Sequence, residues 1–392
     1  MTNLLKKNIL VYYFSIILIS LTKALPHSIL TLILFEKGLT IANIAVVQAM
    51  YSLAILLFEI PSGLWADLYS RKQLYILSNV MLLIMCLLIY YSHNYYLICF
   101  IWFLYGVSES INSGTIEATI INDIKKENNS KLHINRFIKL SNQFSLVAVI
   151  IGSLLGSYLY FNYGLKFYFL SVVLCFLSIL IISIFFKEYS TPMLRENSSL
   201  KQQVKVSIYE LKKSRELKLL FILSVVNQVF FQTHFQLWQA LFLEKGWSSN
   251  KLYILYILFQ VLAILAYSVP ILNINNGQNH LKFLLIFSIV PPLFLHVSNI
   301  YVVLLLYTYS VLIFTVIEYI LTNSFANRVT TQNISSLTSM KSSLSRISAI
   351  IILVSSSYFL KIYSVQYIVT FNFLLSLILL IGISVFYKIK NT

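Results

Sequence analysis

Charged residues are scarce in this chain. Only 11% of its 392 residues are Asp, Glu, Lys or Arg, whereas a soluble domain carries about 25%. Hydrophobic residues make up 58% of the sequence, and the mean hydropathy is +0.81. A water-soluble fold cannot hide that much apolar surface, so the composition indicates an all-α polytopic membrane protein.

Cysteine is also scarce, which limits the chemistry available. Cys86, Cys99 and Cys175 all lie inside apolar runs, without metal-ligand spacing or a soluble domain for disulfides to brace. The soluble segments also lack a nucleotide-phosphate loop, a metal-spaced cluster and a nucleophile–base arrangement. We therefore expect no cofactor, no metal site, and no enzymatic or ATP-driven activity.

Acidic residues are rarer than basic ones. The chain has 13 Asp and Glu and 29 Lys and Arg, which gives a net charge of +16. The basic residues fall in gaps between apolar runs, which argues against nucleic-acid binding and for loops at a membrane surface. Lys6 and Lys7, which precede an apolar run, are similar to the start of a signal peptide. Because no small-residue cleavage site follows, we interpret the segment as a first membrane helix.

Long apolar runs are abundant, and a spanning helix needs about 20 such residues. Twelve candidates cover residues 8–35, 42–62, 73–92, 95–121, 136–161, 165–186, 218–243, 250–271, 281–297, 300–322, 338–360 and 363–387. With the N-terminus inside, 23 of the 29 basic residues fall on the cytoplasmic side, as the positive-inside rule requires. Both termini are then cytoplasmic.

The longest polar stretch separates six runs from six. It predicts an N-terminal six-helix bundle (1–186), a cytoplasmic linker with an amphipathic surface helix (187–217), and a C-terminal six-helix bundle (218–392). The sequence also repeats at an offset of 208 residues, since 34–40 (LFEKGLT) matches 242–248 (FLEKGWS). Each copy follows the first helix of its half, which indicates duplication into parallel halves.

The loop after the second run carries the most specific motif. Four residues match, at the right spacing, the signature loop of the major facilitator superfamily: Gly63, Asp67, Arg71 and Lys72. Leu68 and Ser70 depart from that pattern. The resemblance implies twelve helices in two pseudo-symmetric bundles and transport by alternating access. It further implies that the four residues form a conformational latch that braces the outward-facing state against the eleventh helix. The alternative is a tight loop whose basic residues only follow the positive-inside bias.

Two further stretches bear on the subfamily. Residues 113–118 (SGTIEA), followed by Asp123, resemble the end of the fourth helix in prokaryotic drug-exporter-like members. Residues 152–157 (GSLLGS) form a small-residue face suited to close helix packing. The fifth helix lacks the fuller glycine and proline pattern of the antiporter motif.

Ionisable residues inside the membrane are costly and often functional. The candidates for substrate or proton binding are Lys23, His27, Glu109, Glu117, His234 and Glu318, and they fall on helices one, four, seven and ten. In this superfamily those helices line the central cavity. Glu109 and Glu318 are 209 residues apart, close to the repeat offset. Further polar or aromatic candidates are Asn112, Gln232, Gln236 and Trp238.

These residues predict a polar, net-acidic pocket. A carboxylate shielded from water takes up a proton more readily, so Glu109 or Glu318 could couple proton and substrate binding. The alternatives are a permanent ion pair, for instance Lys23 with Glu109, or a neutral glutamate that fixes helix packing.

The leading hypothesis is proton-coupled efflux of small amphipathic or cationic compounds by a monomer in a bacterial plasma membrane. Its expected partners are a small-molecule substrate, membrane lipid and protons. One alternative is proton-coupled uptake of a metabolite, sugar or peptide. An alternative of another class is a non-transporting receptor or immunity protein on the same scaffold.

Overall fold

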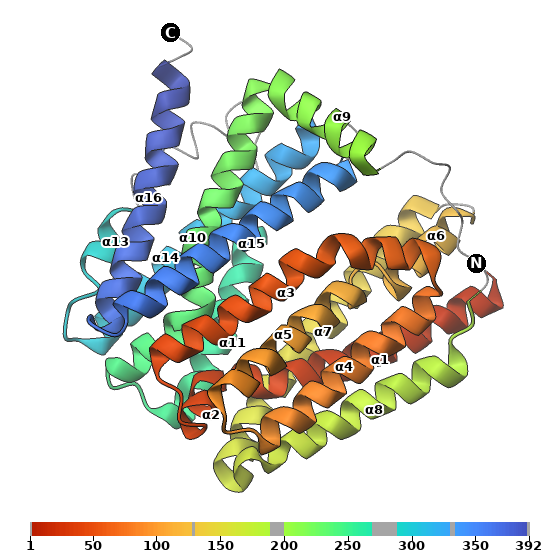
Figure 1. Ribbon diagram of the computed structural model, residues 1–392, viewed down its shortest axis with the longest axis horizontal. Coiled ribbons are helices and arrows are strands. Elements are labelled where there is room, and N and C mark those ends of the chain that lie inside the picture. The colour runs from red at the N-terminus through yellow and green to blue at the C-terminus, as the bar shows by residue number, and fades with distance from the viewer. Residues whose placement is uncertain (1, 128–129, 189–199, 269–287, 330–333, 390–392) are drawn as a thin grey trace. The chain divides into compact units, whose positions relative to one another are not determined.

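The protein is described here from a computed structural model, in which residues 2–127, 130–188, 200–268, 288–329 and 334–389 are described. All regular structure in these residues is helical (Figure 1), which confirms the all-α prediction. Within them, nine stretches are long and apolar enough to cross a membrane. They are Asn3–His27, Ile41–Gly63, Arg71–Tyr91, Leu132–Phe185, Arg215–Glu244, Ser249–Tyr267, Ile300–Phe325, Leu337–Phe359 and Val365–Ser384.

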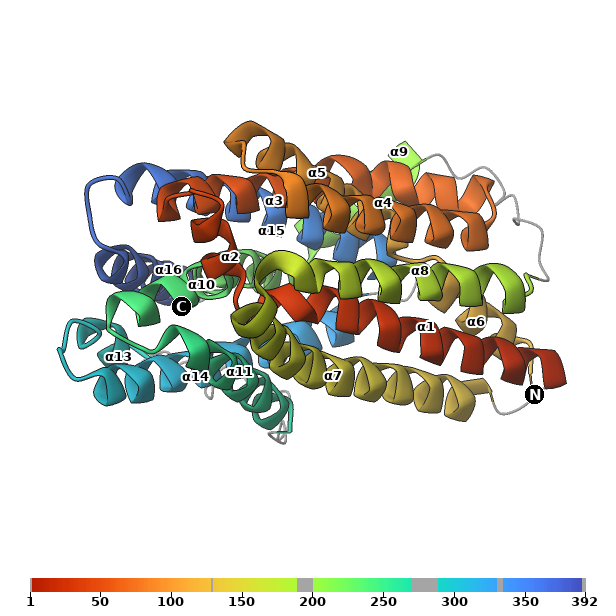
Figure 2. The same ribbon diagram turned by 90° about the horizontal axis from the view of Figure 1, so that it is seen from below.

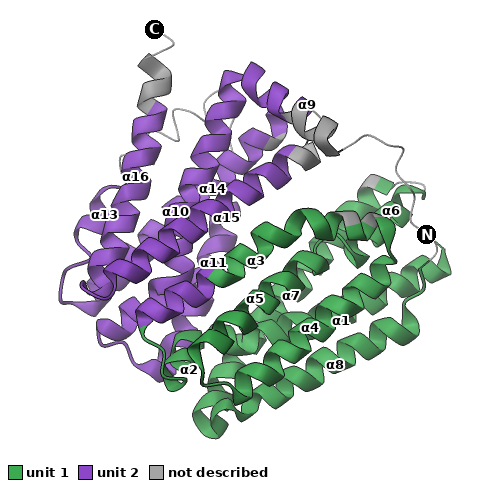
Figure 3. Cartoon of the chain, in the orientation of Figure 1, with its two compact units in different colours: residues 1–40, 50–196 green, residues 41–49, 197–392 purple. Residues whose placement is uncertain are grey.

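The chain divides into two compact units, coloured separately in Figure 3. The first unit comprises residues 1–40 and 50–196, and the second comprises residues 41–49 and 197–392. The first contains α1 (Asn3–His27), α2 (Leu30–Glu36), most of α3 (Ile41–Leu68), α4 (Arg71–Tyr91), α5 (Tyr95–Asn112), α6 (Ile116–Lys125), α7 (Ser130–Tyr163), η1 (Gly164–Lys166) and α8 (Phe167–Phe185). The second contains α9 (Leu200–Lys213), α10 (Arg215–Glu244), η2 (Ser249–Lys251), α11 (Leu252–Tyr267), α13 (Val290–Leu293), α14 (Ile300–Arg328), α15 (Ile334–Phe359) and α16 (Val365–Ile389).

Two predicted helices are interrupted. The run 8–35 is split because α1 ends at His27, just after Pro26, and α2 starts at Leu30. The run 95–121 is split between α5 and α6 by a turn in which Gly114 has a φ of 74°. Short polar and glycine-containing turns end a helix without breaking the apolar character of the run, so hydropathy alone missed both breaks.

The twelve-helix count stays a prediction. The ninth predicted run, 281–297, falls partly on residues 281–287, which lie outside the described residues, and its remainder holds only the short helix α13. The end of the eighth run, 269–271, also lies outside them. So do residues 189–199 of the predicted linker, whereas its second part forms α9.

In the first unit, α1 lies between α7 and α8 (Figure 2). The contact with α7 is close because that helix presents glycines to it. A Cβ at Gly156 would lie 1.8 Å from the carbonyl oxygen of Leu25, and one at Gly152 would lie 2.7 Å from the Cβ of Ala24. The predicted small-residue face is thus confirmed as the surface on which α1 packs.

In the second unit, α10 packs on α14, α15 and α16. Its middle contributes Phe230, which stacks on Phe314 of α14 with ring centroids 3.7 Å apart and also contacts Phe373 of α16. All three rings are buried. The three rings pack on one another, a role that the sequence alone did not distinguish from that of other apolar residues.

The repeated segment has the same backbone geometry in both units. Gly38 and Gly246 have φ values of 82° and 86°, a region open to glycine at little cost. Each glycine ends a helix in a Schellman motif: Leu39 N–H donates to the Leu34 carbonyl (3.1 Å), and Trp247 N–H donates to the Phe242 carbonyl (2.8 Å). The sequence repeat is therefore also a structural one.

Candidate functional site

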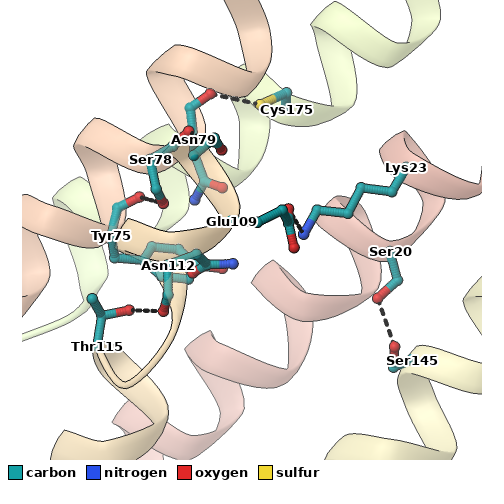
Figure 4. A network of polar contacts seen from close by, with 11 residues as sticks. Ser20, Lys23, Tyr75, Ser78, Asn79, Glu109, Asn112, Thr115, Ser145 and Cys175 are labelled. Carbon is teal, nitrogen blue, oxygen red and sulfur yellow. Dashed lines mark hydrogen bonds and ion pairs between the residues drawn. The ribbon is translucent and has the colours of Figure 1, made fainter. Parts of the chain in front are cut away.

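In the first unit, an ion pair joins the two charged residues predicted on helices one and four. The ammonium of Lys23 on α1 contacts the carboxylate of Glu109 on α5 (Figure 4). The two side chains are 23% and 25% exposed, so both remain accessible. The structure therefore contains the Lys23–Glu109 ion pair, which the sequence analysis gave as an alternative to a glutamate that exchanges a proton.

Other polar groups lie around this pair. Asn112 lies one turn after Glu109, at the end of α5, and its carbonyl accepts a hydrogen bond from the Thr115 hydroxyl (2.7 Å). His27 lies one turn after Lys23 on α1 and is exposed. On α4, the carbonyl of the buried residue Asn79 accepts a contact from the Cys175 thiol (3.1 Å). Figure 4 shows α1, α4 and α5 contributing side chains to one polar region.

Glu117 does not belong to this region. The break after α5 places it on α6, where its side chain is exposed and lies near the Tyr12 hydroxyl of α1. The sequence grouped it with Glu109 because a continuous helix was expected there.

In the second unit, Glu318 on α14 is the centre of a comparable cluster. Asn227 of α10 donates its side-chain amide to one carboxylate oxygen (2.8 Å), and the Thr322 hydroxyl donates to the other (3.2 Å). Nζ of Lys341 on α15 lies 3.7 Å from that second oxygen, and both ionic side chains are mostly buried at 15% and 16% exposure. Sequence reasoning did not single out Lys341, because it counted this lysine among the cytoplasmic basic residues although Lys341 lies inside the predicted run 338–360.

Each of these two carboxylates thus has a lysine partner from another helix of its own unit. The expected net-acidic character is therefore wrong at both positions, because each cluster pairs one negative with one positive charge. A paired, hydrogen-bonded charge is far less costly within a membrane than a lone one.

His234 and Trp238 lie in packed aromatic surroundings. Nδ1 of His234 is 3.0 Å from the hydroxyl of buried Tyr307, and its ring packs against Phe230 and Phe259. Trp238 is buried against Phe259 in an edge-on contact. Gln232 is buried and Gln236 is half-buried on the same helix. The structure does not bring His234 to the Glu318 carboxylate by any hydrogen bond among the described residues.

The signature motif lies where α3 gives way to α4. Gly63 is inside α3, and a Cβ built on it would meet no described atom within 4 Å. The Asp67 side chain lies outside the described residues. Nε of Arg71 donates to the Ala66 carbonyl (3.2 Å), which closes the turn, and Nζ of Lys72 donates to the Ser183 and Phe186 carbonyls (both 2.8 Å) at the end of α8.

Glu188 completes this region and was not predicted. Its carboxylate accepts the Arg71 N–H (3.0 Å) and a hydrogen bond from the Ser70 hydroxyl, and so caps the start of α4. The neighbouring residue Lys187 exchanges two hydrogen bonds with the side chain of buried Asn8 on α1 (2.8 and 3.2 Å). No sequence pattern links residue 188 to residue 70, so only the fold reveals this contact.

Long apolar helices with one carboxylate–lysine pair in each unit are typical of a polytopic membrane transporter. The profile of the Major Facilitator Superfamily matches residues 12–344. The chain belongs to this superfamily, and the resemblance seen in the signature loop is confirmed.

A relative agrees with this assignment, and two solved structures share the fold. The uncharacterized MFS-type transporter YxaM of Bacillus subtilis (strain 168) is 28% identical over 232 residues, which is 56% of this chain and 55% of that protein. The crystal structure of the nucleoside transporter NupG matches with a TM-score of 0.75 at 14% identity, over 99% of this chain and 100% of that one. The POT family transporter PepTSo matches with a TM-score of 0.74 at 11% identity, over 97% and 98%. These two structural likenesses show the fold alone.

Proposed function

We propose that the chain is a proton-coupled secondary transporter that exports small amphipathic compounds by alternating access. The observation that supports this most is the placement of Glu109 and Glu318. They are 209 residues apart in a chain that repeats at 208, and each is held by a lysine from another helix. Carboxylates at corresponding positions of a duplicated chain give each half a group that can bind a proton or a polar substrate.

The ion pairs give the proposed coupling a physical basis. A proton that binds Glu109 cancels its charge and releases Lys23, and the same exchange can occur at Glu318 and Lys341. A substrate with hydrogen-bonding groups then competes with the lysine for the carboxylate. Because each charge is balanced at rest, these clusters suit polar or amphipathic neutral compounds as well as cations.

The signature residues Gly63, Asp67, Arg71 and Lys72 are proposed to act as a latch that favours one of the alternating states. The contacts of Arg71 and Lys72 support a rigid turn at this point, since both side chains bind backbone carbonyls of their own unit. A turn of fixed geometry presents the same groups each time the proposed latch forms a contact with another helix.

An accumulation assay tests the proposal. Cells that express or lack the protein are loaded with amphipathic dyes, nucleosides and dipeptides, with and without a protonophore. We expect lower accumulation of at least one compound in expressing cells, lost on uncoupling and in Glu109→Gln and Glu318→Gln. Higher accumulation would indicate uptake instead. No change with any compound, together with a phenotype that survives both substitutions, would favour a non-transporting receptor.

We further propose a plasma-membrane location with both termini in the cytoplasm, and a monomeric state. The positive-inside distribution of Lys and Arg supports the orientation. Reporter fusions at each terminus test the topology, and sedimentation of the purified protein tests the oligomeric state.

A further inference from the structure

One arginine lies deep within a long apolar helix. Arg346 is on α15, nine residues beyond Leu337 in the 23-residue stretch Leu337–Phe359. A helix rises about 1.5 Å per residue, which puts Arg346 about 14 Å from the Leu337 end. The hydrocarbon core of a membrane is about 30 Å thick. A charge near the middle of a spanning helix is costly, so it marks a functional site unless another group of the protein balances it.

No group of the described residues balances Arg346. Its side chain forms no ion pair and no hydrogen bond with any residue in the described ranges. The carboxylate of Glu318 on α14 is already paired with Lys341. A guanidinium also keeps its proton in proteins, so Arg346 cannot become neutral as a buried carboxylate can.

The position of Arg346 is on the inward side of α15 rather than on its lipid side. Ala349 and Leu353, three and seven residues further on, lie on the same side of the helix and are buried. On the opposite side, Ile351 and Tyr358 are exposed. Arg346 itself is half-buried, so a charge on the inward side of the helix remains accessible at this level.

Polar residues continue this side of the helix towards the start of α15. Three hydroxyl residues lie on it at three- and four-residue spacing: Thr338, Ser342 and Ser345. Thr338 is exposed and the two serines are half-buried, whereas Ala349, just beyond Arg346, is fully buried. The accessible polar side of the helix thus ends at Arg346, where a charged group of a ligand can be held.

We propose that Arg346 binds a carboxylate of the transported compound, which is therefore an amphipathic monocarboxylate. This names the substrate class of the proposed transporter, and its meaning for transport rests on that proposed function.

The balance of charge supports this class. Lys23 is paired with Glu109 and Lys341 with Glu318, so Arg346 leaves these five residues with a surplus of one positive charge. One carboxylate balances that surplus, whereas a phosphate monoester brings about two negative charges near neutral pH. The planar guanidinium also matches both oxygens of a carboxylate in a bidentate pair. An unpaired arginine favours anions over cations.

The Glu318–Lys341 pair offers a second point of contact. Lys341 precedes Arg346 by five residues on α15, which separates them by about 7.5 Å along the helix axis. A compound whose carboxylate pairs with Arg346 can reach the Glu318 cluster with a polar group several bonds away. Carboxylate binding and the proposed proton exchange at Glu318 then involve the same molecule.

The stability of the ligand-free protein separates a binding residue from a structural one. Because Arg346 lacks a partner, Arg346→Gln removes a cost, and the purified full-length variant should melt at a higher temperature than the native protein. Arg328→Gln is the matched control, since Arg328 in the same unit is paired with Glu216 (2.8 Å) and its loss should not raise the melting temperature. A lower melting temperature in Arg346→Gln would overturn the proposal, because it would show that Arg346 holds the unit together.

Ligand-induced shifts of the melting temperature test the class of ligand. The probes are phenylacetate, phenylbutanoate and octanoate at millimolar concentration, each compared with its uncharged amide. We expect at least one acid to stabilise the native protein and its amide to have no effect. Arg346→Gln should bind that acid about tenfold more weakly or worse, and Arg328→Gln as the native protein does. Arg346→Lys, which keeps the charge without the planar fork, should lie between.

Chemical modification tests the site in the native protein without any substitution. Phenylglyoxal reacts with accessible arginines, and peptide mass spectrometry reads Arg346 and Arg328 separately. We expect the acids, but not their amides, to protect Arg346 and to leave Arg328 unprotected.

An Arg346 that is unreactive, or that no acid protects, would overturn the proposal. Equal protection by the amides would do so as well, and stronger protection by phenyl phosphate or by phosphatidylglycerol would replace the carboxylate with a phosphate or a lipid head group. Binding to the purified protein needs no proton gradient. A failed accumulation assay would therefore leave these results standing, and a failure here would leave the proposed proton coupling untouched.

Discussion

Lys341 on α15 lies 3.7 Å from Glu318 on α14, and both side chains are mostly buried. The lysine also lies near the Thr322 hydroxyl (3.4 Å) and over the Phe325 ring (5.5 Å from its centroid). The Lys341 ammonium is therefore held in place by a carboxylate, a hydroxyl and an aromatic face of its own unit.

Lys341→Gln should destabilise the second unit by about 3 kcal/mol, because it leaves a buried carboxylate without its cation. The double variant Glu318→Gln with Lys341→Gln should recover much of that loss. Chemical denaturation of the purified protein measures both, with the exposed residue Lys361 changed to Gln as control. Additive effects of the two substitutions would contradict the pairing.

Gly156→Ala should disrupt the packing of α7 on α1. The new Cβ would meet the backbone carbonyl of Leu25, which cannot rotate away, so we expect a loss of about 3 kcal/mol or failure to assemble. Gly382→Ala is the control, since a Cβ there meets no atom of the described residues within 4 Å. Thermal unfolding in detergent compares them, and equal melting temperatures would refute the close contact.

Glu188→Ala should lower stability by about 1 kcal/mol, the usual value of a helix-capping side chain. The substitution removes the acceptor for the Arg71 N–H and the Ser70 hydroxyl at the start of α4. Glu188→Gln keeps an acceptor oxygen and should lose less. Asp123→Asn, which weakens the pair of Asp123 with the exposed Lys126, should have little effect in the same unfolding assay.

His234→Phe should cost about 1–3 kcal/mol, because it leaves the buried Tyr307 hydroxyl without its partner. Adding Tyr307→Phe should return most of the stability. Since the ring packs among aromatic side chains, we expect the pH profile of transport to stay unchanged in the double variant. A shifted profile would instead assign His234 a role in proton transfer.

The stability contribution of Lys37 should depend on pH. Burial lowers the pKa of its ammonium below the ordinary 10.5, so the unfolded chain binds this proton more tightly than the folded one. Stability is then lowest below the folded pKa and rises as pH approaches 10.5. The melting temperature of the native protein, compared with Lys37→Met, should rise between pH 7 and 10. A pH-independent difference would contradict the burial effect.

The sequence predicted the features that depend on local composition. Apolar runs identified the long helices, and the repeat placed Glu109 and Glu318 at related positions. The Glu-Lys-Gly copies predicted duplication into two halves, and the structure adds that both glycines adopt a positive φ. Such features are encoded by a residue and its near neighbours.

The missed features depend on contacts between distant segments. Lys341 and Glu188 find their partners only after α15 and the end of α8 pack beside α14 and α4. The helix break near Gly114 places Glu117 on α6 rather than on the helix of Glu109, and near Tyr12 of α1. A hydropathy average over an apolar run does not detect such a turn within it.

The positive φ at Gly38 and Gly246 limits how the two halves can diverge after duplication. At φ values of 82° and 86°, any residue with a Cβ is strained, so a mutation at either position is penalised whatever the neighbouring space allows. The following positions, Leu39 and Trp247, have no such restriction and already differ. In an ancestral reconstruction of this lineage, the two glycines should persist as a shared marker after overall similarity between the halves has faded.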